Sequence, residues 1–123
     1  MTIQRSPKKA PEYAEHRAKV AAVDTIASVP KEHGMNMASH EWANVQVVPG
    51  AGLTPTVAVH YWSQAAGKFV VDSDTSAKAA PGAGVPFEFS VRSNGRIMFI
   101  AVTAGAGANG VDVLVSGYDV EKR

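Results

Sequence analysis

The chain contains no cysteine, so disulfides cannot contribute to its stability. Many small secreted domains need disulfides to fold, and this absence therefore favours folding inside a cell. No apolar run approaches the roughly 18 residues of a membrane-spanning helix, and residues 1–9 lack the apolar stretch of a signal peptide. We expect a protein that has no membrane partner and is not exported by the usual route.

Glycine is also absent from residues 1–33, and all 11 glycines of the chain lie from Gly34 onward. This boundary predicts a basic N-terminal arm over residues 1–33 and a folded domain over residues 34–123. The arm has three cations and no acid in its first ten residues, while the domain is mildly acidic. Since the net charge of the whole chain is only +1, we expect the arm to bind an acidic surface of a protein and not nucleic acid. The predicted contact residues are Arg5, Lys8, Lys9, Tyr13 and Arg17.

A short helix is predicted within the arm, over residues 11–22. Pro11 suits the first turn of a helix, and Glu15 and Lys19 have the spacing of a favourable ion pair on one helical face. Pro30 sets the latest end of this helix, because the residue before a proline prefers an extended backbone. Residues 23–29 could instead form a first strand.

The domain is built from short alternating runs separated by glycine-rich turns. Residues 41–48, 56–62, 68–72 and 111–116 place apolar side chains at every second position, which is the period of a strand with one buried face. In the first run Ala43, Val45 and Val47 share a face, and in the last run Val111, Val113 and Val115 do so. Each run therefore predicts a strand.

Residues 87–103 predict a β-hairpin. Asn94-Gly95 suits a type I′ turn, which requires positive φ at both positions, and it lies between two alternating runs. A two-residue loop would pair Val91 with Met98 and give the hairpin one wholly apolar face. With this hairpin the chain has six strands, or seven with one from the arm. We predict an antiparallel β-sandwich, jelly-roll-like or immunoglobulin-like, with a small β-barrel as the alternative.

No motif in the sequence predicts catalysis or a cofactor. Residues 105–110 match the spacing of a dinucleotide-binding loop, but a strand is predicted to follow where that motif needs a helix. Asp72 and Asp74 resemble the start of a calcium loop that lacks its later ligands. The histidines show no metal-binding spacing, and no serine-hydrolase motif occurs. We therefore expect a protein that is not an enzyme and binds neither a metal nor a cofactor.

Two side chains could instead form an aromatic surface. His60 and Trp62 share one face of a predicted strand, opposite the face that carries Val57, Val59 and Tyr61. If that face is open to solvent, it could stack on a sugar or on a partner protein. A carbohydrate-binding or adhesion module is therefore the alternative function.

In strand rhythm and composition the domain resembles small virion proteins of tailed bacteriophages, namely head decoration (cement) proteins and related tail or fibre sandwiches. The resemblance covers roughly residues 40–119 and is clearest in VPFEFSVRSNGRIMFIAVTAGAGANGVDVLVSGYD. It implies a structural protein of the virion, assembled in the host cytoplasm, whose arm lies on the major capsid protein or another virion protein. It also implies a homo-oligomer or a symmetric cluster on the particle.

Overall fold

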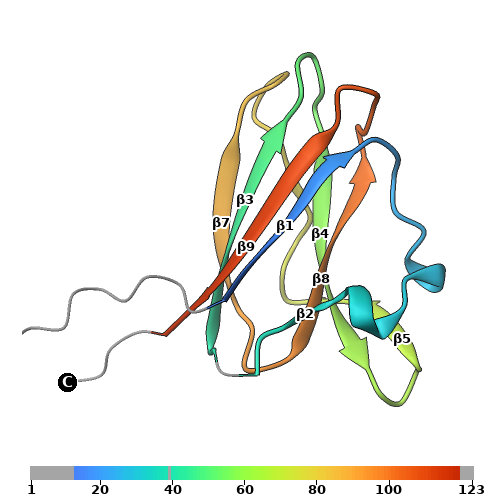
Figure 1. Ribbon diagram of the computed structural model, residues 1–123, viewed down its shortest axis with the longest axis vertical. Coiled ribbons are helices and arrows are strands. Elements are labelled where there is room, and N and C mark those ends of the chain that lie inside the picture. Colours follow the sequence, from blue (N-terminus) through green and yellow to red (C-terminus); the bar gives the residue numbers. More distant parts are fainter. Residues whose placement is uncertain (1–12, 39, 120–123) are drawn as a thin grey trace, which may run out of the picture.

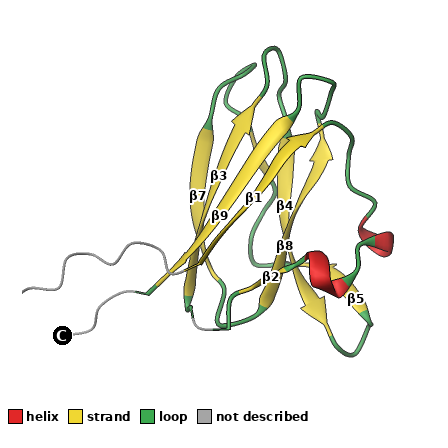
Figure 2. Cartoon of the chain, viewed as in Figure 1, coloured by secondary structure: helices red, strands yellow, loops and turns green. Residues whose placement is uncertain are grey.

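The computed structural model describes residues 13–38 and 40–119, which form two antiparallel sheets packed face to face (Figure 1). The first sheet has the strand order β1 (Tyr13–Val20), β9 (Val111–Tyr118), β3 (Trp42–Pro49) and β7 (Phe87–Arg92). The second has the order β2 (Met35–Asn36), β8 (Ile97–Ala104), β4 (Thr56–Ser63) and β5 (Lys68–Val71), and β6 (Lys78–Ala79) also pairs with β4. The helices of the described part are two single 3-10 turns, η1 (Ile26–Ser28) and η2 (Lys31–His33) (Figure 2).

The strand pairing is that of a jelly roll. β1 pairs with β9, β2 with β8, β3 with β7 and β4 with β5, all antiparallel. In a jelly roll, the chain behaves as one long hairpin that has been rolled up, so that strands equally far from the tip pair with each other. Here the tip lies between β4 and β5. The predicted β-sandwich is thus confirmed, and the jelly-roll form of it applies instead of the barrel.

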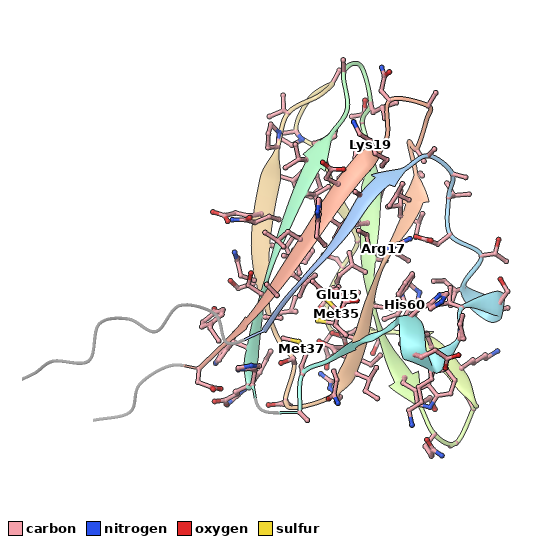
Figure 3. The ribbon with its side chains drawn as sticks, viewed as in Figure 1. Glu15, Arg17, Lys19, Met35, Met37 and His60 are labelled. Carbon is pink, nitrogen blue, oxygen red and sulfur yellow. The ribbon has the colours of Figure 1, made fainter. Side chains whose placement is uncertain are left out.

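The core between the sheets consists of the alternating apolar residues that the sequence predicts. Ala43, Val45 and Val47 of β3 are fully buried, as are Val111, Val113 and Val115 of β9. They face the inward side chains of β4 and β8 in a single cluster that also contains Met35 and Met37 (Figure 3). The predicted strands over 41–48, 56–62, 68–72 and 111–116 agree with β3, β4, β5 and β9, apart from their end residues.

The predicted hairpin over residues 87–103 is wrong, although its turn is right. Asn94 and Gly95 have φ values of 50° and 72°, and the Arg96 N–H donates to the Ser93 carbonyl 3.0 Å away. Yet β7 pairs with β3 in one sheet and β8 pairs with β4 in the other. The chain therefore crosses between the sheets at this turn, and the apolar side chains of β7 and β8 meet across the interior. Period-two alternation shows which face is buried, but it is the same for a hairpin and for such a crossing.

The predicted helix over residues 11–22 is also wrong. Residues 13–20 form the edge strand β1, and residues 11 and 12 lie outside the described part. Along β1 the side chains alternate, with Ala14, His16 and Ala18 exposed and Glu15 and Arg17 half-buried beside Val115 and Val113 of β9. Pairing with β9 outweighs the helix propensity that the alanine, glutamate, arginine and lysine residues give this segment. Because the inward positions are charged, the alternation could not be recognised as that of a strand.

Tyr61 is a buried core residue with an ionisable side chain, and we expect it to make the fold sensitive to alkaline pH. Burial raises the pKa of its phenol above the ordinary value of 10.0, while the Arg96 guanidinium, 3.6 Å from the ring centroid, lowers that pKa. A group whose pKa is higher in the folded chain stabilises the fold below its unfolded pKa and loses this contribution as the pH rises through the folded value. Unfolding in urea between pH 8 and pH 11.5 should show this loss, and Tyr61→Phe should reduce it. An unchanged loss in Tyr61→Phe would contradict the assignment.

Candidate partner-binding surfaces

Two of the five predicted contact residues of the arm, Tyr13 and Arg17, lie in the described part of the chain. Arg5, Lys8 and Lys9 lie outside the described residues, and Tyr13 begins β1, paired with Gly117 of β9. Arg17 is part of the folded sandwich, where its side chain is 24% exposed and bonded to Asp24. Residues 13–33 of the predicted arm therefore belong to the sandwich and not to a free arm.

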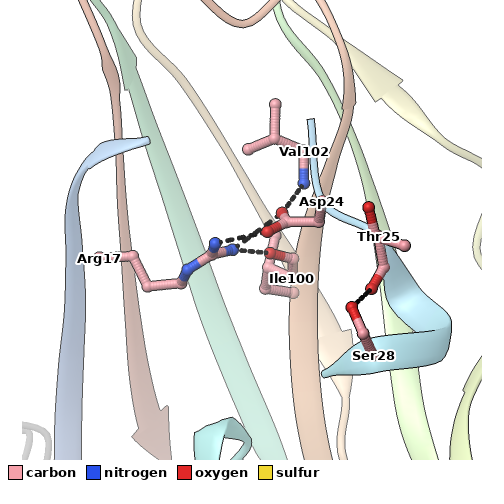
Figure 4. A network of polar contacts seen from close by, with 6 residues as sticks. All are labelled: Arg17, Asp24, Thr25, Ser28, Ile100 and Val102. Atoms are coloured by element: carbon pink, nitrogen blue, oxygen red, sulfur yellow. Dashed lines mark hydrogen bonds and ion pairs between the residues drawn. The ribbon is translucent and has the colours of Figure 1, made fainter. Parts of the chain in front are cut away.

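Arg17 instead joins the edges of the two sheets through Asp24 (Figure 4). Its guanidinium donates to both carboxylate oxygens of Asp24, at 2.7 and 3.1 Å, and to the Ile100 carbonyl at 2.8 Å. It also lies 4.6 Å from the centroid of the Phe99 ring. The side chains of Arg17 and Asp24 are only 24% and 12% exposed, so the ion pair between them is largely removed from water.

Asp24 also replaces a strand residue along the edge of β8. Its backbone N–H donates to the Val102 carbonyl at 2.9 Å, and its carboxylate accepts from the Val102 N–H at 2.7 Å. An unpaired strand edge would expose such groups to solvent and to other chains. Asp24 and Arg17 therefore close the part of β8 that the short strand β2 does not reach.

The His60–Trp62 face is covered and is not an open aromatic surface. Residues 21–34, which we call the strap, run from β1 to β2 and place Ile26 and Val29 on a second cluster of Phe69, Phe99 and Ala101. Trp62 packs against this cluster, and the Lys31 Nζ lies 5.9 Å from its ring centroid. His60 is 7% exposed, with its Nδ1 3.2 Å from the Ala58 carbonyl. Figure 3 places it on the side of the molecule where the strap lies.

A different aromatic cluster lies on the outer face of the first sheet. Tyr118, Trp42 and Arg92 stand side by side on β9, β3 and β7, and we call them the aromatic ladder. The rings of Tyr118 and Trp42 are stacked at 6.5 Å with an angle of 21°, and the Arg92 guanidinium lies 5.6 Å from the Trp42 ring centroid. Trp42 on β3 is thus in contact with Tyr118 from β9 and with Arg92 from β7. Glu41 holds Arg92 in place by accepting from its Nε at 3.0 Å.

Tryptophan, tyrosine and arginine are the residues that most often dominate the binding energy of protein interfaces. The ladder is half-buried and preorganised, so a partner would lose little side-chain entropy on binding it. Sequence reasoning missed it, although a signal was present. The alternation that buries Ala43 and Val45 places Trp42 on the outer face, and the alternation of β9 does the same for Tyr118.

At the other end of the sandwich, three glycine-rich loops pack against one another, over residues 50–55, 80–86 and 105–110 (Figure 1). None of their residues is charged. The Gly50 N–H donates to the Gly110 carbonyl at 2.7 Å, and the Gly84 N–H donates to the Leu53 carbonyl at 2.8 Å. Gly105 has a φ of 74°, and a Cβ there would collide with the Thr54 carbonyl oxygen. These contacts hold the three uncharged loops together, with Lys19 of β1 packed beside Gly110 at their margin and Val85 protruding, 42% exposed.

The remaining candidate groups have structural positions. The loop over residues 105–110 is followed by the strand β9, as predicted, whereas a dinucleotide-binding motif needs a helix there. Asp72 accepts from the Thr75 hydroxyl at 2.7 Å and from the Asp74 N–H at 3.2 Å, which closes a turn. His40 is buried, with its Nδ1 3.4 Å from an Asp119 carboxylate oxygen. In residues 13–38 and 40–119, no group of three or more histidines and carboxylates is placed to hold a metal ion.

Comparison with known proteins leaves the family open. The sequence matches no family model and no curated protein. A solved structure from work on Bacillus endospore appendages, described as a family of disulfide-linked pili, is similar over 96% of this chain and 99% of that chain. The identity is 12% and the TM-score 0.44, so this likeness assigns no function. None of these matches supports the resemblance to phage decoration proteins. Among the described residues there is no helix with the length and apolar character needed to cross a membrane.

Proposed function

We propose that this chain is a non-enzymatic structural protein of a virion, a decoration protein that binds and stabilises a phage capsid. The observation that carries this proposal is the placement of two different contact surfaces at opposite ends of one rigid sandwich. The three loops at one end contain no charged residue, whereas the other end holds the aromatic ladder and the start of β1 at Tyr13. A molecule of this kind is suited to connect two partners.

The loop end supports a contact with a capsid shell. The core of a protein interface is depleted in charged residues, because each charge must lose its hydration when the surfaces meet. The three loops meet this condition, and the hydrogen bonds between them hold their backbone in place before binding. Small side chains also let the backbone of a partner approach closely at little entropic cost.

We expect Val85→Lys to weaken binding to heads of the phage that encodes the chain by about tenfold or more, since it places a charge in the centre of the contact. Co-sedimentation of the purified protein with heads assembled without it measures this. Val71→Lys is the matched control, because Val71 is 54% exposed on β5, away from the loops. Absence of wild-type binding to such heads would refute the capsid role. Equal binding of both variants would show that the loop end is not the contact.

The structure gives no support to the alternative of a carbohydrate-binding module. The strap covers the face that carries His60 and Trp62. This face therefore does not offer the open aromatic surface that the alternative requires.

A further inference from the structure

We propose that residues 1–12 of one copy bind the aromatic ladder of a second copy. This contact would connect copies of the protein on a particle, and it is independent of whether the loop end binds a capsid. It assigns a partner to the one exposed tryptophan–tyrosine–arginine cluster of the described residues.

The position of the segment relative to the ladder supports this contact. Tyr13 pairs with Gly117, and Tyr118 of the ladder is the next residue of β9. Residues 1–12 therefore join the sandwich one strand away from the ladder, at the same end of the sheet. Twelve extended residues span up to about 40 Å, whereas four strands at about 4.8 Å spacing are only about 15 Å wide. The segment is long enough to cross the outer face of a neighbouring sheet.

The chemistry of the segment fits the ladder. Pro7 and Pro11 lie in this segment, which has no glycine, and proline-containing segments bind aromatic surfaces at low entropic cost because their backbone is already restricted. Arg5, Lys8 and Lys9 supply three positive charges, and Glu12 at the end of the segment supplies one negative charge. Two acids lie next to the ladder, since Glu41 pairs with Arg92 and Asp119 follows Tyr118, and Glu88 lies farther along β7, where it accepts from Gln46 and Asn44.

These acids are able to attract the cations of the segment. Glu88 is exposed and accepts only from the side-chain amides of Gln46 and Asn44, at 3.2 and 3.4 Å, in its described hydrogen bonds. The Asp119 side chain is 53% exposed. Glu41 already pairs with Arg92, so Glu88 and Asp119 are the two carboxylates with most capacity for a further ion pair.

A second copy suits the segment better than its own sheet does. β1 begins at Tyr13, at the end of the first sheet that carries the ladder, and from there it runs along the sheet away from the ladder. To bind its own ladder, the segment would have to reverse its direction within the residues just before Tyr13. The ladder of a neighbouring molecule can be reached without such a reversal. Reciprocal exchange between two copies would give a closed dimer, and exchange in one direction would give a ring or a chain.

The lack of cysteine allows a direct test by disulfide crosslinking. Ser6→Cys places a thiol in the segment, and Ser90→Cys places one beside the ladder, where Ser90 is exposed and its Oγ lies 3.3 Å from the Tyr118 hydroxyl. When the two single variants carry tags of different size and are mixed under mild oxidation, we expect a mixed disulfide dimer. Ser76→Cys, exposed in the loop before β6, is the matched control and should give at least about tenfold less of it.

Two outcomes would overturn the proposal. If Ser6→Cys reacts equally with Ser90→Cys and Ser76→Cys, the segment does not bind near the ladder. If the double variant Ser6→Cys/Ser90→Cys forms only a disulfide within one chain, the segment binds its own molecule.

Substitution of Trp42 shows whether the mixed disulfide forms through binding to the ladder or through random collision of the two thiols. We expect Trp42→Ala in the Ser90→Cys protein to lower the yield of the mixed disulfide about tenfold, as for the loss of a central interface residue. Val71→Ala in the same protein should leave the yield unchanged. An equal yield with Trp42→Ala in a protein that still unfolds cooperatively would show that the ladder is not the binding site.

Discussion

Deletion of residues 1–30 is expected to prevent folding of the sandwich, whereas deletion of residues 1–12 leaves it folded. The longer deletion removes β1 and most of the strap. Without β1, the edge of β9 loses all the pairing partners that it has on that side, from Val111 to Gly117. Without Ile26 and Val29, the cluster of Phe69, Phe99 and Ala101 becomes exposed to water.

These losses exceed what a domain of this size can tolerate, because total stabilities are only about 5–15 kcal/mol. An unprotected strand edge also favours aggregation. Thermal unfolding followed by circular dichroism tests the expectation. The chain without residues 1–12 should melt cooperatively within a few degrees of the full chain, and the chain without residues 1–30 should be insoluble or show no cooperative transition. A cooperative transition near the wild-type temperature in the longer deletion would contradict the integral role of β1 and the strap.

The second large effect is expected from Asp24→Ala. This substitution removes the two carboxylate oxygens that accept from the Arg17 guanidinium. One of them also accepts from the Val102 N–H, which loses its acceptor. The guanidinium and the amide then remain largely buried without these partners, which costs more than the net gain of a surface ion pair. We expect the free energy of unfolding to fall by about 2–4 kcal/mol.

Urea unfolding followed by tryptophan fluorescence measures this change. Asp74→Ala is the matched control, because Asp74 is an exposed loop residue, and it should change the free energy of unfolding by no more than about 0.5 kcal/mol. In a double-mutant cycle with Arg17→Ala, the two substitutions should cost less together than the sum of their separate effects. A loss below about 1 kcal/mol in Asp24→Ala would mean that water replaces the carboxylate, and the edge would then not depend on it.

The sequence by itself determined the strands of the domain and their buried faces. Ala43, Val45 and Val47 are buried because alternate residues of a strand point to opposite sides, and this relation is local. The turn at Asn94-Gly95 was equally predictable, since positive φ at two successive positions depends on those two residues. Such features need only neighbouring residues, and a single chain displays them directly.

Only the tertiary structure decided which strands pair, what residues 13–34 do and where a partner could bind. Alternation does not say whether β8 lies beside β7 or across from it. The charges of Glu15 and Arg17 concealed a strand, and Arg17 is compensated by Asp24, beyond the end of β1, and by the Ile100 carbonyl of β8, 83 residues away. The aromatic ladder requires three strands to be brought together, and the cover over His60 and Trp62 requires the strap to cross the second sheet. Each of these features depends on contacts between distant segments, and no local pattern records them.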